Sequence, residues 1–223
     1  MLSVHGRKPA AVVVEPIAKA FLKLGLTPNV VTIVGTIVTI AISVILIPTG
    51  HLFSAAVLSG LFAAFDMLDG TMARLTGKAT AFGATLDASC DRITDGALFS
   101  AIAWWLIYSA DSSRITVIAC FVTLVCSQVI SYIKARGEAS GFKMVGGLIE
   151  RPERLILGLG GIGLEGLGVP HAIEVALWIL AVGSVFTVCQ RMVIAARQEQ
   201  HDSDEGELYG IHHGAHETGA GER

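Results

Sequence analysis

Long apolar runs are the feature that most constrains this chain. A transmembrane helix needs about 20 consecutive, mainly apolar residues. The mean hydropathy is +0.64 although only 7% of the residues are aromatic, a composition that indicates a membrane protein rather than a soluble domain. The sequence therefore predicts an all-α, polytopic membrane protein with six transmembrane helices, over residues 30–47, 52–65, 82–108, 115–133, 155–169 and 172–195.

The segment before the first run predicts a further helix on the membrane surface. Ile17, Phe21 and Leu24 fall at helical spacing opposite Lys19 and Lys23, as in an interfacial amphipathic helix, although a helix docked on the first span would show the same pattern. Charges throughout the first 24 residues argue against a cleavable signal peptide. We expect an N-terminal segment (1–27), a six-helix membrane domain (28–197) and a disordered acidic, His-rich tail (198–223).

The distribution of charge predicts an orientation. With six spans, nearly all Lys and Arg residues fall on one side of the membrane, and the opposite loops hold only Arg114. By the positive-inside rule, both termini are expected to face the cytoplasm from the cell membrane. The net charge of −3 reflects the tail, where seven acids oppose Arg223. The cationic face suits anionic membrane lipids or an anionic substrate, and nucleic acid is excluded because the chain has no soluble basic domain.

Five aspartates stand where a bilayer protein should avoid them: Asp66, Asp69, Asp87, Asp91 and Asp95. A charged side chain near the bilayer centre costs ~2.5 to 3.5 kcal/mol on insertion scales. One interpretation is that these side chains lie just beyond the helix ends in headgroup water, paired with nearby arginines and lysines. The other is that they form a site.

The spacing of the aspartates favours a metal site. Asp66 and Asp69 are three residues apart and Asp87 and Asp91 are four apart, so each pair projects from one face of a helix. If the two faces meet, four carboxylates share one point and repel each other unless cations bind between them. Because neither a His nor a Cys cluster is present, Mg²⁺ or Mn²⁺ with oxygen ligands is the expected metal.

The residues between the acids fit a phosphate ligand. Gly70 and Gly83 remove side chains beside the acids and permit close approach to the backbone, while Arg74 can bind phosphate oxygens. The pattern Asp-x-x-Asp-Gly-x-x-Ala-Arg over 66–74, eight further residues, and Gly-x-x-x-Asp-x-x-x-Asp over 83–91 resembles the complete signature of the CDP-alcohol phosphotransferase family. All eight fixed positions match.

The resemblance implies a site for a CDP-linked lipid, CDP-diacylglycerol, in a six-helix protein that is usually a homodimer with a polar cavity open to the cytoplasm. It implies that Asp66 and Asp87 bridge two metal ions, that Asp69 and Asp91 complete their sites, and that Asp91 is the general base. In this family a Pro-Asn-x-x-Thr stretch like that at 28–32 contacts the nucleotide. The nucleotide ligands implied are Asn29, Thr32, Gly70, Arg74, Thr80 and Gly83.

The signature leaves the acceptor open, since the family uses glycerol 3-phosphate, serine, inositol, inositol phosphate, choline and phospholipid. A further set of cations gathers on the cytoplasmic side: Lys134, Arg136, Arg151, Arg154 and Arg191. Positive-inside bias explains such cations without any substrate. Arg191, however, lies about a turn and a half inside its predicted span, and guanidinium groups there suit an acceptor that carries its own phosphate.

Residues 131–138 (SYIKARGE) and 151–154 (RPER) are similar to the actinobacterial branch of the family, which joins inositol 1-phosphate to CDP-diacylglycerol. The members that use glycerol 3-phosphate are the alternative, and a cation-coupled transporter is a more remote one, because acids inside membranes also build ion pathways. The run Gly158–Gly163 fits G-x-G-x-x-G but lies inside an apolar span, so we interpret it as helix packing rather than a dinucleotide site.

Overall fold

The computed structural model describes residues 7–77 and 79–214, with side chains described over 14–63, 68–77 and 79–200. Within that part the chain is all helical: no strand is present, which confirms the predicted class. The helices are α2 (Arg7–Lys23), α3 (Pro28–Leu46), α4 (Leu52–Thr76), α5 (Ala81–Tyr108), α6 (Arg114–Ala139), α7 (Arg151–Gly166) and α8 (Ala172–Gly214).

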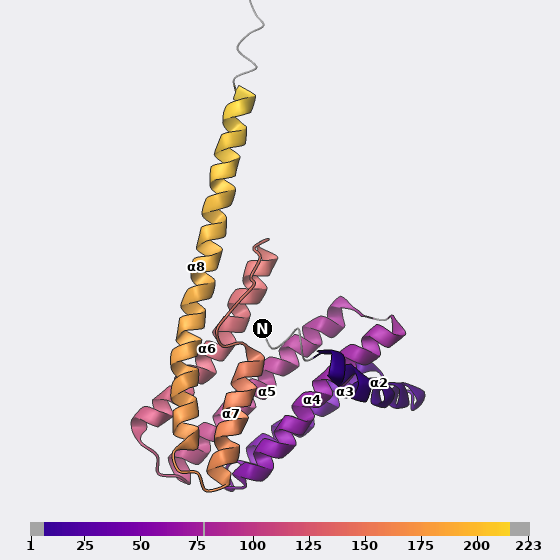
Figure 1. Ribbon diagram of the computed structural model, residues 1–223, viewed down its shortest axis with the longest axis vertical. Coiled ribbons are helices and arrows are strands. Elements are labelled where there is room, and N and C mark those ends of the chain that lie inside the picture. The colour runs from indigo at the N-terminus through magenta and orange to yellow at the C-terminus, as the bar shows by residue number, and fades with distance from the viewer. Residues whose placement is uncertain (1–6, 78, 215–223) are drawn as a thin grey trace, which may run out of the picture.

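Six of the described helices close into a ring. Each packs on two neighbours in the order α3, α4, α7, α8, α6, α5 and back to α3, and α2 packs against the outside of α4. Figure 1 shows α8 following α6 and α7 and then extending well beyond the other helices. Because α5 and α7 are not neighbours in this ring, long side chains must connect them across its interior.

The helix starts follow local capping rules. The hydroxyl of Thr27 accepts a hydrogen bond from the Val30 amide, and Pro28 occupies the first turn of α3, where a proline needs no amide hydrogen. The Thr80 hydroxyl accepts from the Gly83 amide, 3.0 Å away, at the start of α5. These caps fix the first turns of the two helices that carry much of the candidate site.

From α3 to α8, helices that follow one another along the chain run antiparallel, and most of the connections between them are short. One end of the bundle holds the connections 24–27, 77–80 and 140–150, and the other holds 47–51, 109–113 and 167–171. Every residue that the sequence singled out for chemistry belongs to α3 to α8 or to the 77–80 connection, so the arrangement can collect these residues at the first of the two ends.

The glycines of α7 allow close helix packing, as predicted for the G-x-G-x-x-G run. A Cβ on Gly161 would lie 2.7 Å from the Ala176 Cβ of α8, and one on Gly163 would lie 3.2 Å from the Ala56 Cβ of α4. Gly158 faces the ring of Phe99 on α5. These glycines allow three other helices to pack on α7. Because the glycines lie within a helix, they do not form the turn of a dinucleotide-binding site.

Four of the described helices are long and apolar enough to cross a membrane: α3, α4, α6 and α8 within 172–200. The count of six spans is therefore not confirmed by length and composition. Helix α5 has 28 residues but carries Asp87, Asp91, Arg92 and Asp95, and α7 has only 16 residues.

The ends of the chain differ from the predicted boundaries. Helix α2 begins at Arg7, earlier than the predicted amphipathic stretch, and α8 continues past residue 198 to Gly214. The proposed state of the tail stays a prediction, and residues 215–223 lie outside the described part.

Candidate active site

Most of the site residues predicted from the sequence gather around two pockets at the same end of the bundle. The first, which we call the glycine pocket, has a volume of about 250 Å³ between α3, α4 and α5. Its lining includes all six predicted nucleotide ligands: Asn29, Thr32, Gly70, Arg74, Thr80 and Gly83. Asp69 and Asp87 line it as well.

Small residues and short hydrogen bonds shape the glycine pocket. The Thr32 hydroxyl donates to Asp69 Oδ2, and the Gly70 amide donates to Asp69 Oδ1, so both oxygens of this buried carboxylate are held. A Cβ on Gly83 would lie 3.2 Å from the Thr80 hydroxyl and 3.4 Å from Asn29 Oδ1. The pocket is therefore open at Gly83 only because that residue has no side chain.

The second pocket, which we call the arginine pocket, lies between α5, α6, α7 and α8 and has a volume of about 370 Å³. Its lining includes four of the five predicted acceptor cations, namely Lys134, Arg151, Arg154 and Arg191, and also Arg92. Arg136 is exposed near the end of α6 and does not line this pocket. Asp87 and Asp91 line its other side.

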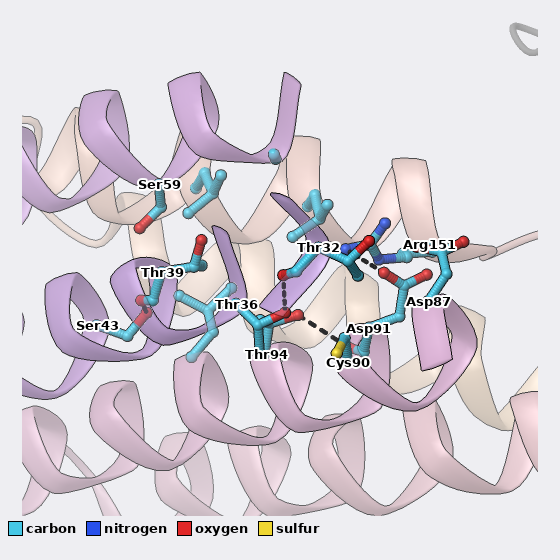
Figure 2. A pocket seen from close by; sticks show the side chains of 14 residues that line it. Thr32, Thr36, Thr39, Ser43, Ser59, Asp87, Cys90, Asp91, Thr94 and Arg151 are labelled. Carbon is cyan, nitrogen blue, oxygen red and sulfur yellow. Dashed lines mark hydrogen bonds and ion pairs between the residues drawn. The ribbon is translucent and has the colours of Figure 1, made fainter. Parts of the chain in front are cut away.

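Asp87 belongs to both pockets, which makes it their meeting point. Asp91, one turn further along α5, faces the arginine pocket and a narrow third cavity between α3, α4, α5 and α7. Figure 2 shows Asp87, Asp91 and Arg151 together at one end of this third cavity, with Thr39, Ser43 and Ser59 at the other end. A ligand in either main pocket can thus reach Asp87.

Three arginines of the arginine pocket form close ion pairs with carboxylates of the protein, and a fourth, Arg92, lies 3.6 Å from Asp91 Oδ2. Arg151 lies 2.8 Å from Asp91 Oδ1, Arg154 lies 2.7 Å from Asp95 Oδ2, and Arg191 lies 2.8 Å from Glu150 Oε1. Their roles therefore differ from those of free surface cations, because each guanidinium is oriented by a fixed partner.

Arg191 is the most constrained of the three. Beyond Glu150, it donates to the backbone carbonyls of Ile130, at 2.7 Å, and Gly146, at 3.2 Å. Its side chain is 3% exposed, so it ties α8 to α6 and to the connection between α6 and α7. The prediction that Arg191 binds an acceptor phosphate remains open, but the structure adds a role in holding this connection.

The oxygen-rich donor set fits a hard divalent cation. Asp69, Asp87 and Asp91 come from two helices that converge on one region, where Thr32 supplies a hydroxyl group beside Asp69 and no histidine of the described part of the chain lines the pockets. Among the described side chains, no three His, Cys, Asp or Glu groups come together at metal-binding distance. The side chain of Asp66 lies outside the described residues, so the predicted four-carboxylate set is described only in part.

Sequence reasoning missed several residues of the site. Glu150 caps α7 and binds Arg191, and Asp95 binds Arg154, yet neither was assigned a partner. It also missed a stripe of hydroxyl groups on α3 that lines the third cavity: Thr32, Thr36, Thr39 and Ser43. Their spacing of four, three and four residues follows one helix face and could have revealed the stripe in an otherwise apolar run.

Comparison with known proteins agrees with the geometry. The family model described as CDP-alcohol phosphatidyltransferase matches residues 25–189. The chain is 65% identical over 197 residues to the phosphatidylinositol phosphate synthase of Corynebacterium glutamicum, covering 88% of this chain and 90% of that one. It is 49% identical to the Mycobacteroides abscessus enzyme of the same name, covering 86% and 87%.

Solved structures show the same likeness. A crystal structure of Mycobacterium tuberculosis phosphatidylinositol phosphate synthase with CDP-DAG bound superimposes with a TM-score of 0.80 at 50% identity, covering 83% of this chain and 94% of that one. The same enzyme in complex with manganese and citrate gives a TM-score of 0.78 at 50% identity, with coverage of 82% and 88%. The chain belongs to the CDP-alcohol phosphatidyltransferase family of membrane enzymes.

Proposed function

We propose that this chain transfers the phosphatidyl group of CDP-diacylglycerol to inositol 1-phosphate, which yields phosphatidylinositol phosphate and CMP. The observation that carries the proposal is the meeting of the glycine and arginine pockets at Asp87. One pocket has small residues and a single arginine, and the other is rich in cations. This division suits a nucleotide-linked donor on one side and a phosphorylated acceptor on the other.

The CDP part of the donor binds in the glycine pocket. Gly70 and Gly83 let the pyrophosphate approach the backbone, and Arg74 on the pocket wall supplies a cation for its oxygens. Asn29, Thr32 and Thr80 supply the polar contacts. The Mycobacterium tuberculosis relative with CDP-DAG bound supports this donor.

Asp66, Asp69, Asp87 and Asp91 hold two divalent ions, Mg²⁺ or Mn²⁺. The manganese-bound relative supports the need for a divalent metal. Such a pair of ions, when bound, neutralises the pyrophosphate and stabilises the charge on the departing CMP. In this chain Thr32 and Gly70 orient the Asp69 carboxylate. This carboxylate therefore needs little reorganisation when a metal ion binds.

Asp91 acts as the general base. An acceptor hydroxyl in the arginine pocket gives its proton to this carboxylate, and its oxygen forms a bond to the phosphorus that carries the diacylglycerol. The bond from that phosphorus to the CMP oxygen breaks, so CMP leaves with the electron pair. Arg151, 2.8 Å from Asp91 Oδ1, keeps the carboxylate turned toward the arginine pocket.

The phosphate of the acceptor binds among Lys134, Arg151, Arg154 and Arg191, which line the arginine pocket. Arg136 was assigned the same role, and its exposed place outside the pocket lining suits a longer-range attraction of the anionic substrate. A neutral acceptor such as serine or inositol gains nothing from so many cations, which favours the phosphorylated compound.

The protein works as a homodimer in the cell membrane, with six spans and with both pockets and both termini facing the cytoplasm. Helix α5 spans with its charged face turned into the ring, where Asp95 is buried by protein, and such burial makes a charged span tolerable. Lys19, Lys23, Lys134 and Lys143 lie toward the pocket end, as the positive-inside rule requires.

The test is release of CMP from CDP-diacylglycerol by the purified protein with Mg²⁺ or Mn²⁺. Four acceptors are compared: inositol 1-phosphate, inositol, glycerol 3-phosphate and serine. We expect turnover with inositol 1-phosphate at least tenfold faster than with any other, and loss of turnover on chelation of the metal. Preferred turnover of glycerol 3-phosphate or free inositol would overturn the acceptor, and no CMP release with any acceptor would overturn the reaction.

A further inference from the structure

A buried ion pair joins α5 to α7 across the interior of the ring. Arg154 NH2 lies 2.7 Å from Asp95 Oδ2, and the two side chains are 1% and 0% exposed. The two helices are not neighbours in the ring, so this contact is made through the length of the arginine side chain. Asp95 lies outside the eight-residue signature of the family, and neither the metal site nor the transfer chemistry uses it.

The stability of the fold does not explain this pair. Taking two charges out of water costs several kcal/mol per ion, and replacement of a buried pair by apolar residues is often neutral or stabilising. The pair is also incompletely satisfied, because Asp95 Oδ1 and Arg154 Nε are buried without a hydrogen-bond partner among the described residues. A charged pair of this kind needs a reason other than packing.

The position of the pair supplies a reason. Asp91 and Asp95 are one turn apart on α5, and Arg151 and Arg154 are nearly one turn apart on α7. They form two parallel contacts, with Arg151 on Asp91 at the pocket and Arg154 on Asp95 behind it. Arg154 lines the arginine pocket even so. Asp95 thus binds Nη2 of a guanidinium that is part of the pocket lining.

Asp95 also decides which carboxylate Arg154 binds. Asp91 lies one turn away on the same face of α5 and already has Arg151 2.8 Å from its Oδ1 and Arg92 3.6 Å from its Oδ2. A further arginine there would compete with both for one carboxylate. The presence of Asp95 gives Arg154 a partner of its own.

We propose that Asp95 is a positioning residue that orients Arg154 toward the phosphate of the acceptor and keeps it away from Asp91. The proposal rests on the proposed function, since it concerns the acceptor of that reaction. Its signature is selective: loss of Asp95 weakens binding of the acceptor and leaves binding of CDP-diacylglycerol nearly unchanged.

The experiment compares wild type, Asp95→Asn and the double variant Asp95→Leu with Arg154→Met, which replaces the pair by apolar side chains. Steady-state kinetics give separate KM values for both substrates, titration calorimetry gives the affinity for inositol 1-phosphate, and thermal unfolding in detergent measures folding. Thr123→Val is the matched control, because Thr123 is fully buried on α6 and bonds only within its own helix.

We expect Asp95→Asn to raise the KM for inositol 1-phosphate and its dissociation constant about tenfold, the scale of one lost charge-assisted contact. The KM for CDP-diacylglycerol should change less than twofold, and Thr123→Val should change neither. The double variant should remain folded and show the same weak acceptor binding. If this variant instead regains wild-type acceptor binding, the pair serves only the fold and the inference is wrong.

Two further outcomes separate this inference from the proposed function. Normal acceptor binding in a folded Asp95→Asn variant would overturn the positioning role while the reaction itself stands. If the wild-type protein neither binds nor turns over inositol 1-phosphate, the proposed function fails first. Should Asp95→Asn fail to fold, Asp95→Glu decides, because it keeps the ion pair but moves the carboxylate by one methylene group: an unchanged acceptor KM in this variant would overturn the positioning role.

Discussion

The two pockets hold their polar groups in different ways. In the glycine pocket most of the key residues lie within 69–87, and local contacts position several of them: Thr80 caps its own helix, and the Gly70 amide binds the adjacent Asp69. Thr32 of α3 adds a contact from farther along the chain. In the arginine pocket the cations come from four helices, and carboxylates or carbonyls distant in the sequence hold three of the arginines. A donor site can therefore be encoded by a motif, whereas the acceptor site depends on the assembled bundle.

The largest expected effect concerns Asp91, the proposed general base, which lines the arginine pocket one turn from the shared Asp87. Asp91→Asn should leave the protein folded and lower kcat by about 10³, within the range for loss of a general base. Release of CMP and thermal unfolding measure the two quantities. Asp111→Asn, in the connection at the opposite end of the bundle, is the control and should keep full activity. Normal turnover of Asp91→Asn would remove the base from the mechanism.

The glycine pocket can be tested by filling it. Gly83→Ala places a Cβ 3.2 Å from the Thr80 hydroxyl and 3.4 Å from Asn29 Oδ1, so we expect the KM for CDP-diacylglycerol to rise about twentyfold, roughly 2 kcal/mol of lost binding. The KM for the acceptor should stay the same. Gly96→Ala on the same helix meets no atom within 4 Å and serves as the matched control. Equal effects of the two alanines would contradict a nucleotide site at Gly83.

Acceptor binding in the arginine pocket should depend on the contacts that hold Arg191. Arg191→Lys keeps the charge but loses the planar fork that binds Glu150 and two carbonyls. We expect a loss of about 2 kcal/mol of stability, below the cost of removing a buried partner outright, and an acceptor KM about fivefold higher. Thermal unfolding and kinetics measure both. Arg197→Lys, exposed on the same helix, should be neutral. A raised acceptor KM with unchanged stability would instead favour direct contact with the phosphate.

The smallest effect is expected at the contact between Gln198 of α8 and Lys143 in the connection between α6 and α7. Gln198 accepts from the Lys143 amide at 2.7 Å and donates to the Lys143 carbonyl at 3.1 Å. Gln198→Ala should speed hydrogen exchange at the Lys143 amide about fivefold, since a net hydrogen bond contributes ~1 kcal/mol, and should change the acceptor KM less than twofold. Gln200→Ala is the control. Unchanged exchange would mean that the Gln198 contact does not hold this connection.

The same contrast explains how much could be predicted from the sequence. The helical class follows from apolar runs, the pairing of the acids from their spacing, and the six proposed nucleotide ligands from the resemblance to the family; all six line one pocket. The partners of Arg151, Arg154 and Arg191 could not be predicted, because the order of helices around the ring brings α5, α7 and α8 together and no local pattern specifies that order.

The count of spans shows a second limit of sequence reasoning. Charged residues lower the apolar character of α5, and α7 is short, yet both helices take part in the ring. Whether each crosses the membrane depends on burial of its polar face by neighbouring helices, as for Asp95 and Arg154. Hydropathy averaged along one segment does not contain that information.

Asp87 lines both pockets, and this has a consequence for the order of events in turnover. Donor and acceptor can occupy the protein together, with the reacting phosphorus between them, so the lipid never has to be stored on a side chain as a covalent adduct. Double-reciprocal plots of rate against one substrate at several levels of the other should then intersect rather than run parallel, as for an enzyme that works through a ternary complex.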